Sequence, residues 1–291
     1  MDVKDFAEIR KRIDYTVSTR GQWVGICNED GWPIMDITAI ANVSASETRG
    51  ETASCEVAVE VPEGSRLIDE LVGPDTGINK TGELEIAGAA ARLLVVQRAG
   101  MRMAYTITHT VATGKTAPTQ LTIHGVDLIE SLAAWPCPTI PLLWQNASFT
   151  QWTTDASGQE YTTTRELARV EMGTAADGYT VDGPAAATAR TLIQDSLDAV
   201  NTAMGWADSP HMVVDFPKGE DTSPRLVIRT NDDTIWETIA APAHSAGLTI
   251  SVDLWWPGDQ PLRRRVSREP EEFTSWSPTV PIQLVTVEVS K

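Results

Sequence analysis

Residues 231–260 hold the most closely spaced local-structure signals of the chain, and they constrain its fold most strongly. Thr234 and Glu237 have the spacing of a capping box, in which each side chain satisfies a free backbone N–H at a helix start. Gly247 is placed to end that helix, although Pro242 predicts a kink or an earlier end. After Gly247, apolar residues recur at every second position, which predicts a strand with one buried face. The members of this series are Leu248, Ile250, Val252, Leu254 and Trp256.

Strand-like runs separated by glycines or polar turns dominate residues 20–110, and they predict a small antiparallel barrel or sandwich. The runs cover residues 22–27, 34–40, 55–61, 83–87, 91–97 and 102–110. Helices and strands alternate from residue 122 to residue 256, and the clearest helix is 185–204, which Pro184 opens. The expected fold class is therefore α+β and β-rich, with small antiparallel β-barrel-like domains and interspersed helices.

Four segments are expected along the chain. Residues 1–133 form a β-rich, barrel-like domain, and residues 134–183 form a proline-rich connection followed by a polar, loop-rich insertion or peripheral hairpin. Residues 184–260 form a mixed α/β domain, and residues 261–291 supply a strand or arm that returns to the β-rich part.

Composition narrows the class of partner. The chain of 291 residues, 42% of them hydrophobic, is long enough for two or three domains with cores of their own. No apolar run approaches the roughly 18 residues of a membrane span, so none is expected. With 23 basic and 40 acidic residues the net charge is −17, which argues against phosphate backbones or anionic lipids as main partners. The three cysteines are far apart and form no Cys-x-x-Cys pair, so neither a disulfide framework nor a zinc site is expected.

A search for catalytic signatures finds none of the familiar nucleophile, phosphate-loop, dinucleotide, zinc-protease or calcium-loop motifs. His244, next to Ser245, is the best candidate for a general base, and the alternative is a histidine that interacts with the last carbonyls of a helix. Asp232 and Asp233 are expected to favour a helix start rather than to bind a metal ion, and Asp253 is expected to face solvent. We therefore expect a protein that is not an enzyme and that binds no cofactor or metal.

Tryptophans and arginines supply the candidate contact surface. Ten tryptophans occur against four phenylalanines. In the pair Trp255-Trp256, one ring is expected to point out of the strand's buried face, where a subunit, domain or sugar would cover it. The basic run Arg263-Arg264-Arg265, together with Arg268, is expected to meet carboxylates of a partner or neighbouring subunit. The interface candidates are Trp135, Trp144, Trp255, Trp256, Arg263, Arg264 and Arg265.

The order of these features resembles that of actinobacteriophage minor tail proteins of the tail-hub, or baseplate-hub, type. A strand and helix, Leu121-Thr-Ile-His-Gly-Val-Asp-Leu-Ile-Glu-Ser-Leu, precede the proline-rich Ala134-Trp-Pro-Cys-Pro-Thr-Ile-Pro. Gly183-Pro184 then opens a long helix, and Trp236 in a helix precedes Ala246-Gly247-Leu248 and Leu254-Trp-Trp-Pro-Gly-Asp. The resemblance covers most of residues 20–260, while residues 145–181 match the pattern poorly. Many family members continue beyond the position of Lys291.

The resemblance implies a structural virion protein at the tail tip, assembled in the host cytoplasm. Two small barrel domains per subunit would form a homotrimeric, pseudo-sixfold ring that joins the tail tube and distal tail protein to the tip. Implied partners are the distal tail protein, the tape measure protein and other minor tail proteins, with genome DNA only in passage. The alternatives are a carbohydrate-binding module that recognises host surface glycans and a tail-associated cell-wall hydrolase.

Overall fold

The computed structural model describes residues 3–46, 48, 50–62, 67–72, 91–114, 118–144, 147, 149–168 and 179–290. The chain forms two compact units. Unit 1 comprises Met1–Leu128, Asp253–Asp259 and Pro278–Pro281. Unit 2 comprises Ile129–Val252, Gln260–Ser277 and Ile282–Lys291. The structure thus divides the chain differently from the four expected segments, because residues 253–259 belong to unit 1 and most of residues 261–291 belong to unit 2.

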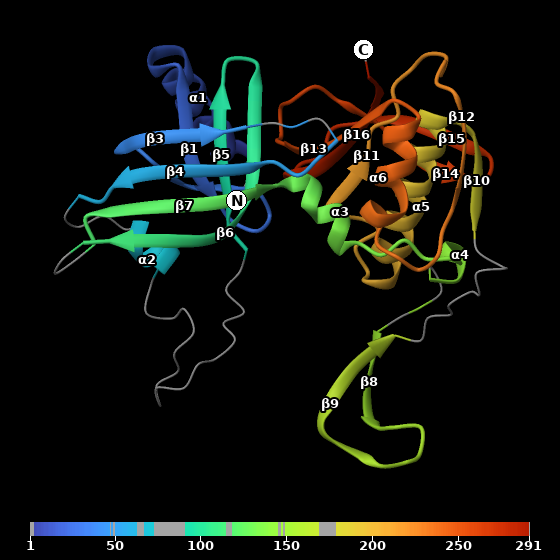
Figure 1. The fold of residues 1–291 in the computed structure, drawn as a ribbon. Coiled ribbons are helices and arrows are strands. Elements are labelled where there is room, and N and C mark those ends of the chain that lie inside the picture. The colour runs from blue at the N-terminus through green and yellow to red at the C-terminus, as the bar shows by residue number, and fades with distance from the viewer. Residues whose placement is uncertain are drawn as a thin grey trace. The chain divides into compact units, whose positions relative to one another are not determined.

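Unit 1 is built on an antiparallel sheet with the strand order β2-β1-β5-β6-β7-β4-β3 (Figure 1). The strands are β1 (Gln22–Cys27), β2 (Pro33–Asp36), β3 (Ile40–Ala45), β4 (Ser54–Glu60), β5 (Leu93–Arg98), β6 (Met101–Thr113) and β7 (Gln120–Asp127). The predicted hairpin of β1 and β2 is present, but the predicted strand 34–40 is divided into β2 and β3. The predicted strand 83–87 lies outside the described residues.

The two edge strands of this sheet, β2 and β3, are joined only by residues 37–39. The N–H of Ile37 donates to the carbonyl of Val24 at 2.8 Å, and the N–H of Glu60 donates to the carbonyl of Ala39 at 2.8 Å. Because so short a link connects opposite edges, the sheet must be rolled. Among the described residues, β2 and β3 do not pair with each other, so the sheet does not close into a barrel. The barrel-like form expected from the sequence is therefore a rolled sheet whose two edges are joined by the covalent link of residues 37–39.

The core of unit 1 is formed by alternate residues of these strands, as the period of two predicts. Cys55, Val57 and Val59 of β4 are examples. Leu67 of α2 (Leu67–Val72) joins the same cluster. The other face of β1 is packed against α1 (Val3–Arg20), whose Phe6 and Ile13 are buried. This burial on both sides explains why five successive residues of β1 are buried.

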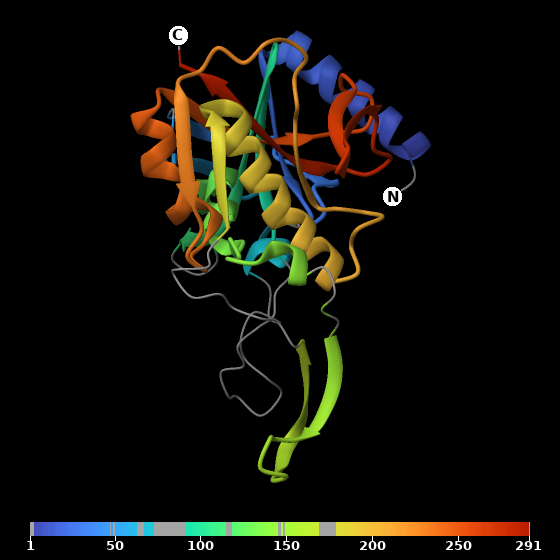
Figure 2. The same ribbon diagram turned by 90° about the vertical axis from the view of Figure 1, so that its right-hand side faces the viewer.

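Unit 2 is organised around helix α5 (Ala185–Ala203), most of whose residues are buried. Figures 1 and 2 show this helix in yellow beside α6 (Ile235–Ser245) in orange. Its other neighbours are α4 (Pro141–Trp144), β10 (Thr180–Pro184), β11 (Met212–Val214), β12 (Arg225–Arg229) and β16 (Ile282–Val289). The free N–H groups of Ala186 and Ala187 donate to Ser223 Oγ at 2.9 Å and Asp221 Oδ2 at 2.7 Å, so a distant loop caps α5.

Small sheets of two or three strands and short helical segments accompany α5 in unit 2. β10 pairs with β12, and β16 lies between the parallel β11 and the strand β13 (Leu248–Trp255). β14 (Leu262–Arg268) pairs antiparallel with β15 (Glu271–Trp276). The helix predicted after β7 is present as a 3-10 turn, η1 (Leu128–Glu130), followed by α3 (Ser131–Ala134).

The capping box predicted for α6 is present. The N–H of Glu237 donates to Thr234 Oγ1 at 3.2 Å, and the N–H of Thr234 donates to Glu237 Oε2 at 3.1 Å. The predicted early end is wrong, because α6 runs through Pro242 to Ser245. Proline removes one N–H but keeps its carbonyl, which accepts from the N–H of Ala246 at 3.0 Å.

The polar segment of residues 145–181, where the resemblance to tail-hub proteins is poor, contains a hairpin of β8 (Phe149–Thr154) and β9 (Glu160–Ala168). Among the described residues, the two strands pair with each other and with no other strand, so they form a two-stranded sheet of their own. Of the two expectations for this segment, loops or a hairpin, the structure shows the hairpin over residues 149–168.

Candidate functional site

The structure corrects the expectation that Trp255 points out of the protein. The exposed fractions of Trp255 and Trp256 are 4% and 0%, so the protein itself covers both rings. β13 ends at Trp255, so Trp256 lies beyond the alternating strand and its side-chain direction is set by the following turn. Neither ring is available as the exposed contact that the alternation predicts.

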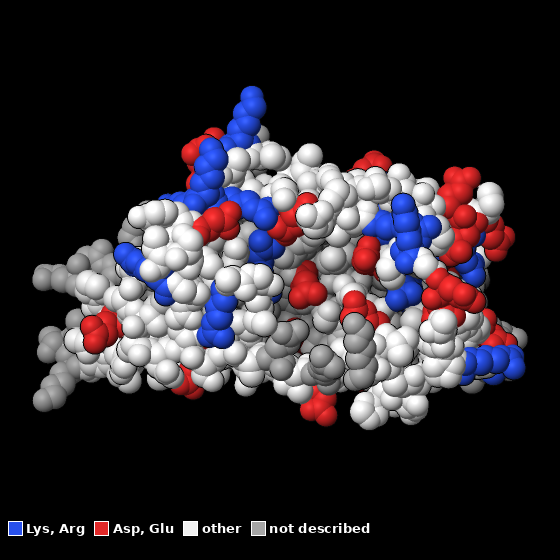
Figure 3. Space-filling model, turned by 90° about the horizontal axis from the view of Figure 1, so that it is seen from above, with Lys and Arg blue, Asp and Glu red and all other residues white. Residues whose placement is uncertain are grey.

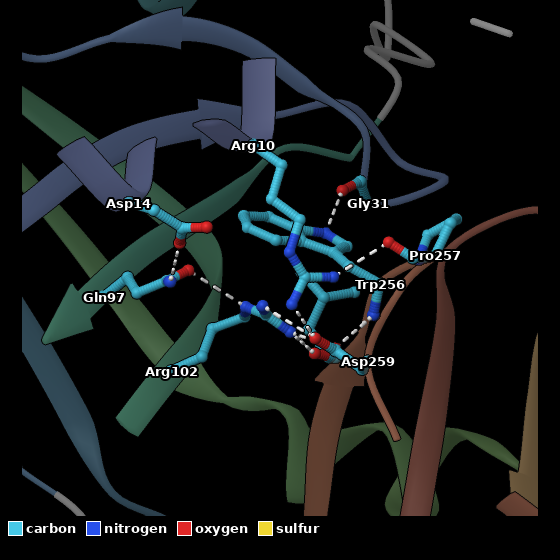
Figure 4. A network of polar contacts seen from close by, with 9 residues as sticks. Arg10, Asp14, Gly31, Gln97, Arg102, Trp256, Pro257 and Asp259 are labelled. Atoms are coloured by element: carbon cyan, nitrogen blue, oxygen red, sulfur yellow. Dashed lines mark hydrogen bonds and ion pairs between the residues drawn. The ribbon is translucent and has the colours of Figure 1, made fainter. Parts of the chain in front are cut away.

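Trp256 is held within unit 1 by aromatic neighbours and by the polar and charged groups that Figure 4 shows. Its ring makes edge contacts with Phe6 at 5.5 Å and Trp23 at 6.1 Å between centroids. The Arg102 guanidinium lies 4.0 Å from the centre of the ring. The Nε1–H donates to the carbonyl of Gly31 at 2.9 Å. The indole therefore has aromatic and cationic neighbours within unit 1, and its N–H is hydrogen-bonded.

Asp259 joins two arginines beside this ring (Figure 4). Its carboxylate accepts from Arg10 and Arg102 at 2.6 Å each, and from the backbone N–H of Trp256 at 2.8 Å. Burial acts to raise the pKa of Asp259, but the bond and charge of Arg102, the backbone N–H of Trp256 and the charge of Arg10 outweigh it, and the pKa is lowered. Asp259 is thus a structural carboxylate that stays ionised.

The sequence Trp256-Pro-Gly-Asp forms a tight turn. The N–H of Asp259 donates to the carbonyl of Trp256 at 2.9 Å, with proline at the second position and Gly258 at φ +93° at the third. This is the residue pattern of a type II turn, which requires positive φ at its third residue. The turn places Asp259 where its carboxylate meets the N–H of Trp256.

The arginines of β14 were expected together at an interface, but each contacts different residues within unit 2. Arg263 stacks on Phe273 at 4.1 Å and donates to the carbonyl of Phe216 at 3.0 Å. Arg264 stacks on Trp276 at 4.2 Å. Arg265 is buried, so it is not an exposed contact residue.

Arg265 meets carboxylates, as its charge predicts, but they belong to its own chain. Its Nη2 donates to Asp195, and to Asp198 Oδ2 at 2.9 Å, one turn further along α5. Arg268 Nε lies 3.3 Å from Asp195 Oδ2. Tyr179 donates its hydroxyl hydrogen to Asp195. The sequence signal for this cluster is the i, i+3 pair of acidic residues in α5, which sequence reasoning missed.

The cluster shifts several pKa values. Burial acts to lower the pKa of Arg265, but Asp195 and Asp198 outweigh it and raise that pKa. Burial raises the pKa of the Asp198 carboxyl, the charge of Asp195 adds to this, and bonds from Gln194 and Arg265 only partly oppose it. Burial and Asp195 together raise the pKa of the Tyr179 hydroxyl. The tyrosine therefore acts as a hydrogen-bond donor.

A cavity of about 360 Å³ lies beside this cluster in unit 2. α5 contributes Gln194, Asp195, Asp198, Asn201 and Thr202 to its lining. β14 contributes residues 264–268, and apolar residues from other parts of unit 2 complete the wall. The lining of the cavity therefore carries charged, amide and hydroxyl groups.

The other candidate residues have structural environments. Trp135 is partly buried and makes an edge contact with Trp206 at 6.4 Å. Trp144 ends α4 and is also partly buried. Asp232, expected to support a helix start, instead accepts from the N–H of Thr139 at 2.7 Å and from its hydroxyl at 2.8 Å. His244 is exposed in the last turn of α6, and Asp253 is exposed as expected.

The β8–β9 hairpin carries exposed apolar residues. Trp152 is opposite Arg165, and Thr150 is opposite Leu167, so these four side chains share one face of the hairpin. Trp152 is 44% exposed and Leu167 is 41% exposed. Phe149, on the opposite face, is 44% exposed. Unlike Trp255 and Trp256, these apolar side chains are left substantially exposed by the described part of the protein.

On the face in Figure 3, acidic and basic side chains are interspersed rather than gathered in one acidic patch. Among the described residues, no group of three or more His, Cys, Asp or Glu side chains is arranged to hold a metal ion. No helix within the described ranges is long and apolar enough to cross a membrane.

No protein-family model matches the sequence, and no curated protein matches it. Among solved structures, the chain is similar to the tail protein from Neisseria meningitidis MC58. The identity is 11% and the TM-score is 0.33, over 91% of this chain and 71% of that chain. At that identity and score, the likeness by itself assigns neither a family nor a function.

Proposed function

We propose that this chain is a structural virion protein of a phage tail, a subunit of the tail-tip or baseplate hub. In this proposal three copies form a ring that links the tail tube and the distal tail protein to the tip. The chain works without catalysis and without a cofactor. Its partners are itself, the distal tail protein, the tape measure protein and other minor tail proteins, with genome DNA only in passage.

The observation that carries this proposal is the β8–β9 hairpin. An isolated two-stranded sheet is only marginally stable in water. Trp152 and Leu167 nevertheless lie on one exposed face of it. Large apolar side chains exposed together are typical of surfaces that contact another protein. Each strand also has one edge with no strand partner among the described residues, where a neighbouring chain would pair.

The family-like motifs support the same proposal. The segment ending in Trp256-Pro-Gly-Asp packs into unit 1 and places no group for chemistry, since its indole and carboxylate are fully engaged. Gly183-Pro184 opens α5, the central helix of unit 2. The residues that resemble tail-hub proteins thus build the fold, as expected when a family conserves architecture rather than catalysis.

The assembly state of the purified full chain tests the proposal. Light scattering coupled to size exclusion is expected to give three times 31.6 kDa for the wild type. The double variant Trp152→Ser, Leu167→Ser is expected to shift the mass toward one copy. Phe149→Ser is the matched control, because it removes an equally exposed aromatic from the other face of the same hairpin. A monodisperse monomer for the wild type would contradict the proposal.

Cross-linking mass spectrometry on intact virions locates the chain. Cross-links from this chain to itself, to the distal tail protein and to the tape measure protein are expected. Absence of the chain from purified particles would exclude the virion role. Zymography on bacterial cell walls is expected to show no clearing by the wild type or by His244→Ala, and clearing by the wild type would favour the hydrolase alternative.

A further inference from the structure

Two histidines meet on the outer face of the sheet of unit 1. His109 of β6 lies directly opposite His124 of β7, and Glu56 of β4 lies directly opposite His124 on its other side. The chain neighbours Val57 and Ile123 belong to the core, so this row of three side chains lies on the other face of the sheet. The two imidazole rings are stacked, with centroids 4.4 Å apart and planes 9° apart. The fold thus brings together two imidazoles that the sequence alone does not pair.

Hydrogen bonding leaves the same nitrogen of each ring free. The Thr108 hydroxyl donates its one hydrogen to the carbonyl of His124 at 3.3 Å, so it accepts from His109 Nδ1, which lies 3.1 Å away. His124 Nδ1 lies 3.8 Å from Glu56 Oε2, and a carboxylate likewise favours a hydrogen on the nitrogen that faces it. In both neutral rings Nε2 therefore keeps its lone pair. Among the described residues, no hydrogen bond is made to either Nε2.

A β-bulge creates this arrangement. The register of β6 against β7 shifts between Ile107 and His109, which makes Thr108 an extra residue opposite β7. The extra residue places its hydroxyl within reach of both His109 Nδ1 and the carbonyl of His124. Bulges commonly re-aim side chains in this way beside functional sites.

The surroundings of the pair favour a cation. β4 and β7 contain no Lys or Arg, and Arg102 of β6 forms an ion pair with Asp259. Glu56 adds a negative charge beside His124, in a chain whose net charge is −17. A carboxylate at the far nitrogen is a usual partner of a metal-binding histidine, because it fixes the tautomer and the orientation of the ring. Neutral imidazoles are the ligands that copper, nickel and zinc ions share.

One metal ion fits between the two rings after they rotate. An ion about 2.1 Å from each nitrogen joins two nitrogens that are about 3–4 Å apart, depending on the angle at the metal. The stack holds the ring centroids at 4.4 Å, but each lone pair lies in the plane of its own ring, so the rings must turn toward each other. The torsion that turns a histidine ring is broad. His109 is exposed and the side chain of His124 is 28% exposed, so solvent borders both rings.

We propose that His109 and His124 bind a divalent first-row transition-metal ion of the copper, nickel and zinc group through their Nε2 atoms. Water fills the other positions of the ion, and Glu56 positions His124. A pair of ligands is smaller than the groups of three or more that the described residues lack. The inference departs from the expectation that the chain binds no metal. It does not depend on the assembly role proposed above, because it rests on strands of unit 1 and not on the β8–β9 hairpin.

Titration of the full chain with Cu²⁺ tests the proposal, because Cu²⁺ has the highest affinity of these ions for such ligands. Calorimetry in a buffer that does not bind metal gives the affinity, and electron spin echo envelope modulation counts the imidazoles on the ion. One tightly bound ion per chain with two imidazoles is expected. His109→Gln and His124→Gln are each expected to weaken binding at least about tenfold, the smallest loss common even for groups that only support a ligand. Circular dichroism of both variants checks that the fold is kept.

His244→Gln is the matched control. His244 is an exposed histidine of α6 in unit 2, so its removal is expected to leave both the affinity and the imidazole count unchanged. Carboxylates and the chain's amino terminus also bind Cu²⁺, but they do so without a pair of imidazoles. A tightest ion with fewer than two imidazoles would overturn the proposal. Equal Cu²⁺ affinity in the wild type, His109→Gln and His124→Gln would overturn it as well, and so would loss of the two-imidazole signal in His244→Gln.

Discussion

Replacing Trp256 with alanine is expected to destabilise unit 1 by about 4–6 kcal/mol. Removal of a fully buried tryptophan commonly costs about 3–5 kcal/mol. The ring also makes edge contacts with Phe6 and Trp23, and its N–H satisfies the carbonyl of Gly31. An unsatisfied buried carbonyl adds about 1–3 kcal/mol, although such contributions are not fully additive. Trp256→Phe keeps a ring and loses the N–H, so a loss of about 1–2 kcal/mol is expected.

Hydrogen exchange with mass spectrometry, measured in increasing urea, assays this prediction. Because the chain has two compact units, exchange must be read from peptides of α1, β1 and β5, which report on unit 1. Tyr15→Ala is the control, since that exposed side chain of α1 is expected to change stability by less than about 0.5 kcal/mol. An opening free energy of unit 1 in Trp256→Ala within about 1 kcal/mol of wild type would refute the reasoning.

Three further variants test the charged and turn residues. The folded pKa of Asp259 lies below its ordinary value of 3.8, so its carboxylate stabilises the fold above that pH and loses this effect as pH falls through the folded pKa. The difference in unfolding free energy between wild type and Asp259→Asn, from urea titrations at stepped pH, is therefore expected to shrink on acidification. Gly258→Ala is expected to lower stability by about 1–2 kcal/mol in thermal melts, because φ is +93° and the new Cβ would lie 3.0 Å from Arg10 Nη1. Arg265→Met is expected to cost about 3–5 kcal/mol by hydrogen exchange of α5, because it leaves the buried Asp195 without this partner.

Each of these variants has its own control. Gly100 also has positive φ, but an added Cβ there would meet nothing within 4 Å, so Gly100→Ala measures backbone strain alone. A larger loss for Gly100→Ala than for Gly258→Ala would contradict the contact with Arg10. Adding Asp195→Leu to Arg265→Met is expected to restore much of the lost stability, and a further loss would argue against an uncompensated carboxylate. A constant difference between wild type and Asp259→Asn from pH 7 to pH 2 would contradict the linkage argument.

The local elements were predictable from the sequence because their causes are local. Thr234 and Glu237 lie three residues apart, and the structure shows the reciprocal bonds that this spacing predicts. The alternation of Cys55, Val57 and Val59 likewise places all three side chains in one core. The α+β, β-rich class follows from such signals, since each needs only neighbouring residues to be evaluated.

The candidate site was less predictable because its contacts join distant parts of the chain. Alternation along β13 gives the relative directions of neighbouring side chains, but it does not reveal that Phe6 and Trp23 surround Trp256. The charge of Arg265 predicts carboxylate partners, and the chain supplies them from α5, some 70 residues earlier. The exposed apolar residues of the hairpin could not be predicted for a different reason. Trp152 and Leu167 lie in a polar stretch without strong periodicity.

The three-residue link between β2 and β3 sets a covalent limit on how far the sheet of unit 1 can flatten. Extended chain spans about 3.3–3.6 Å per residue, so the ends of the link, Asp36 and Ile40, are at most about 14 Å apart. Lengthening the link with glycines would allow Asp36 and Ile40 to lie farther apart without removing a hydrogen bond from any strand pair. The width of the rolled sheet, and with it the space for its core side chains, is therefore encoded in the length of residues 37–39 as well as in the volume of the side chains inside.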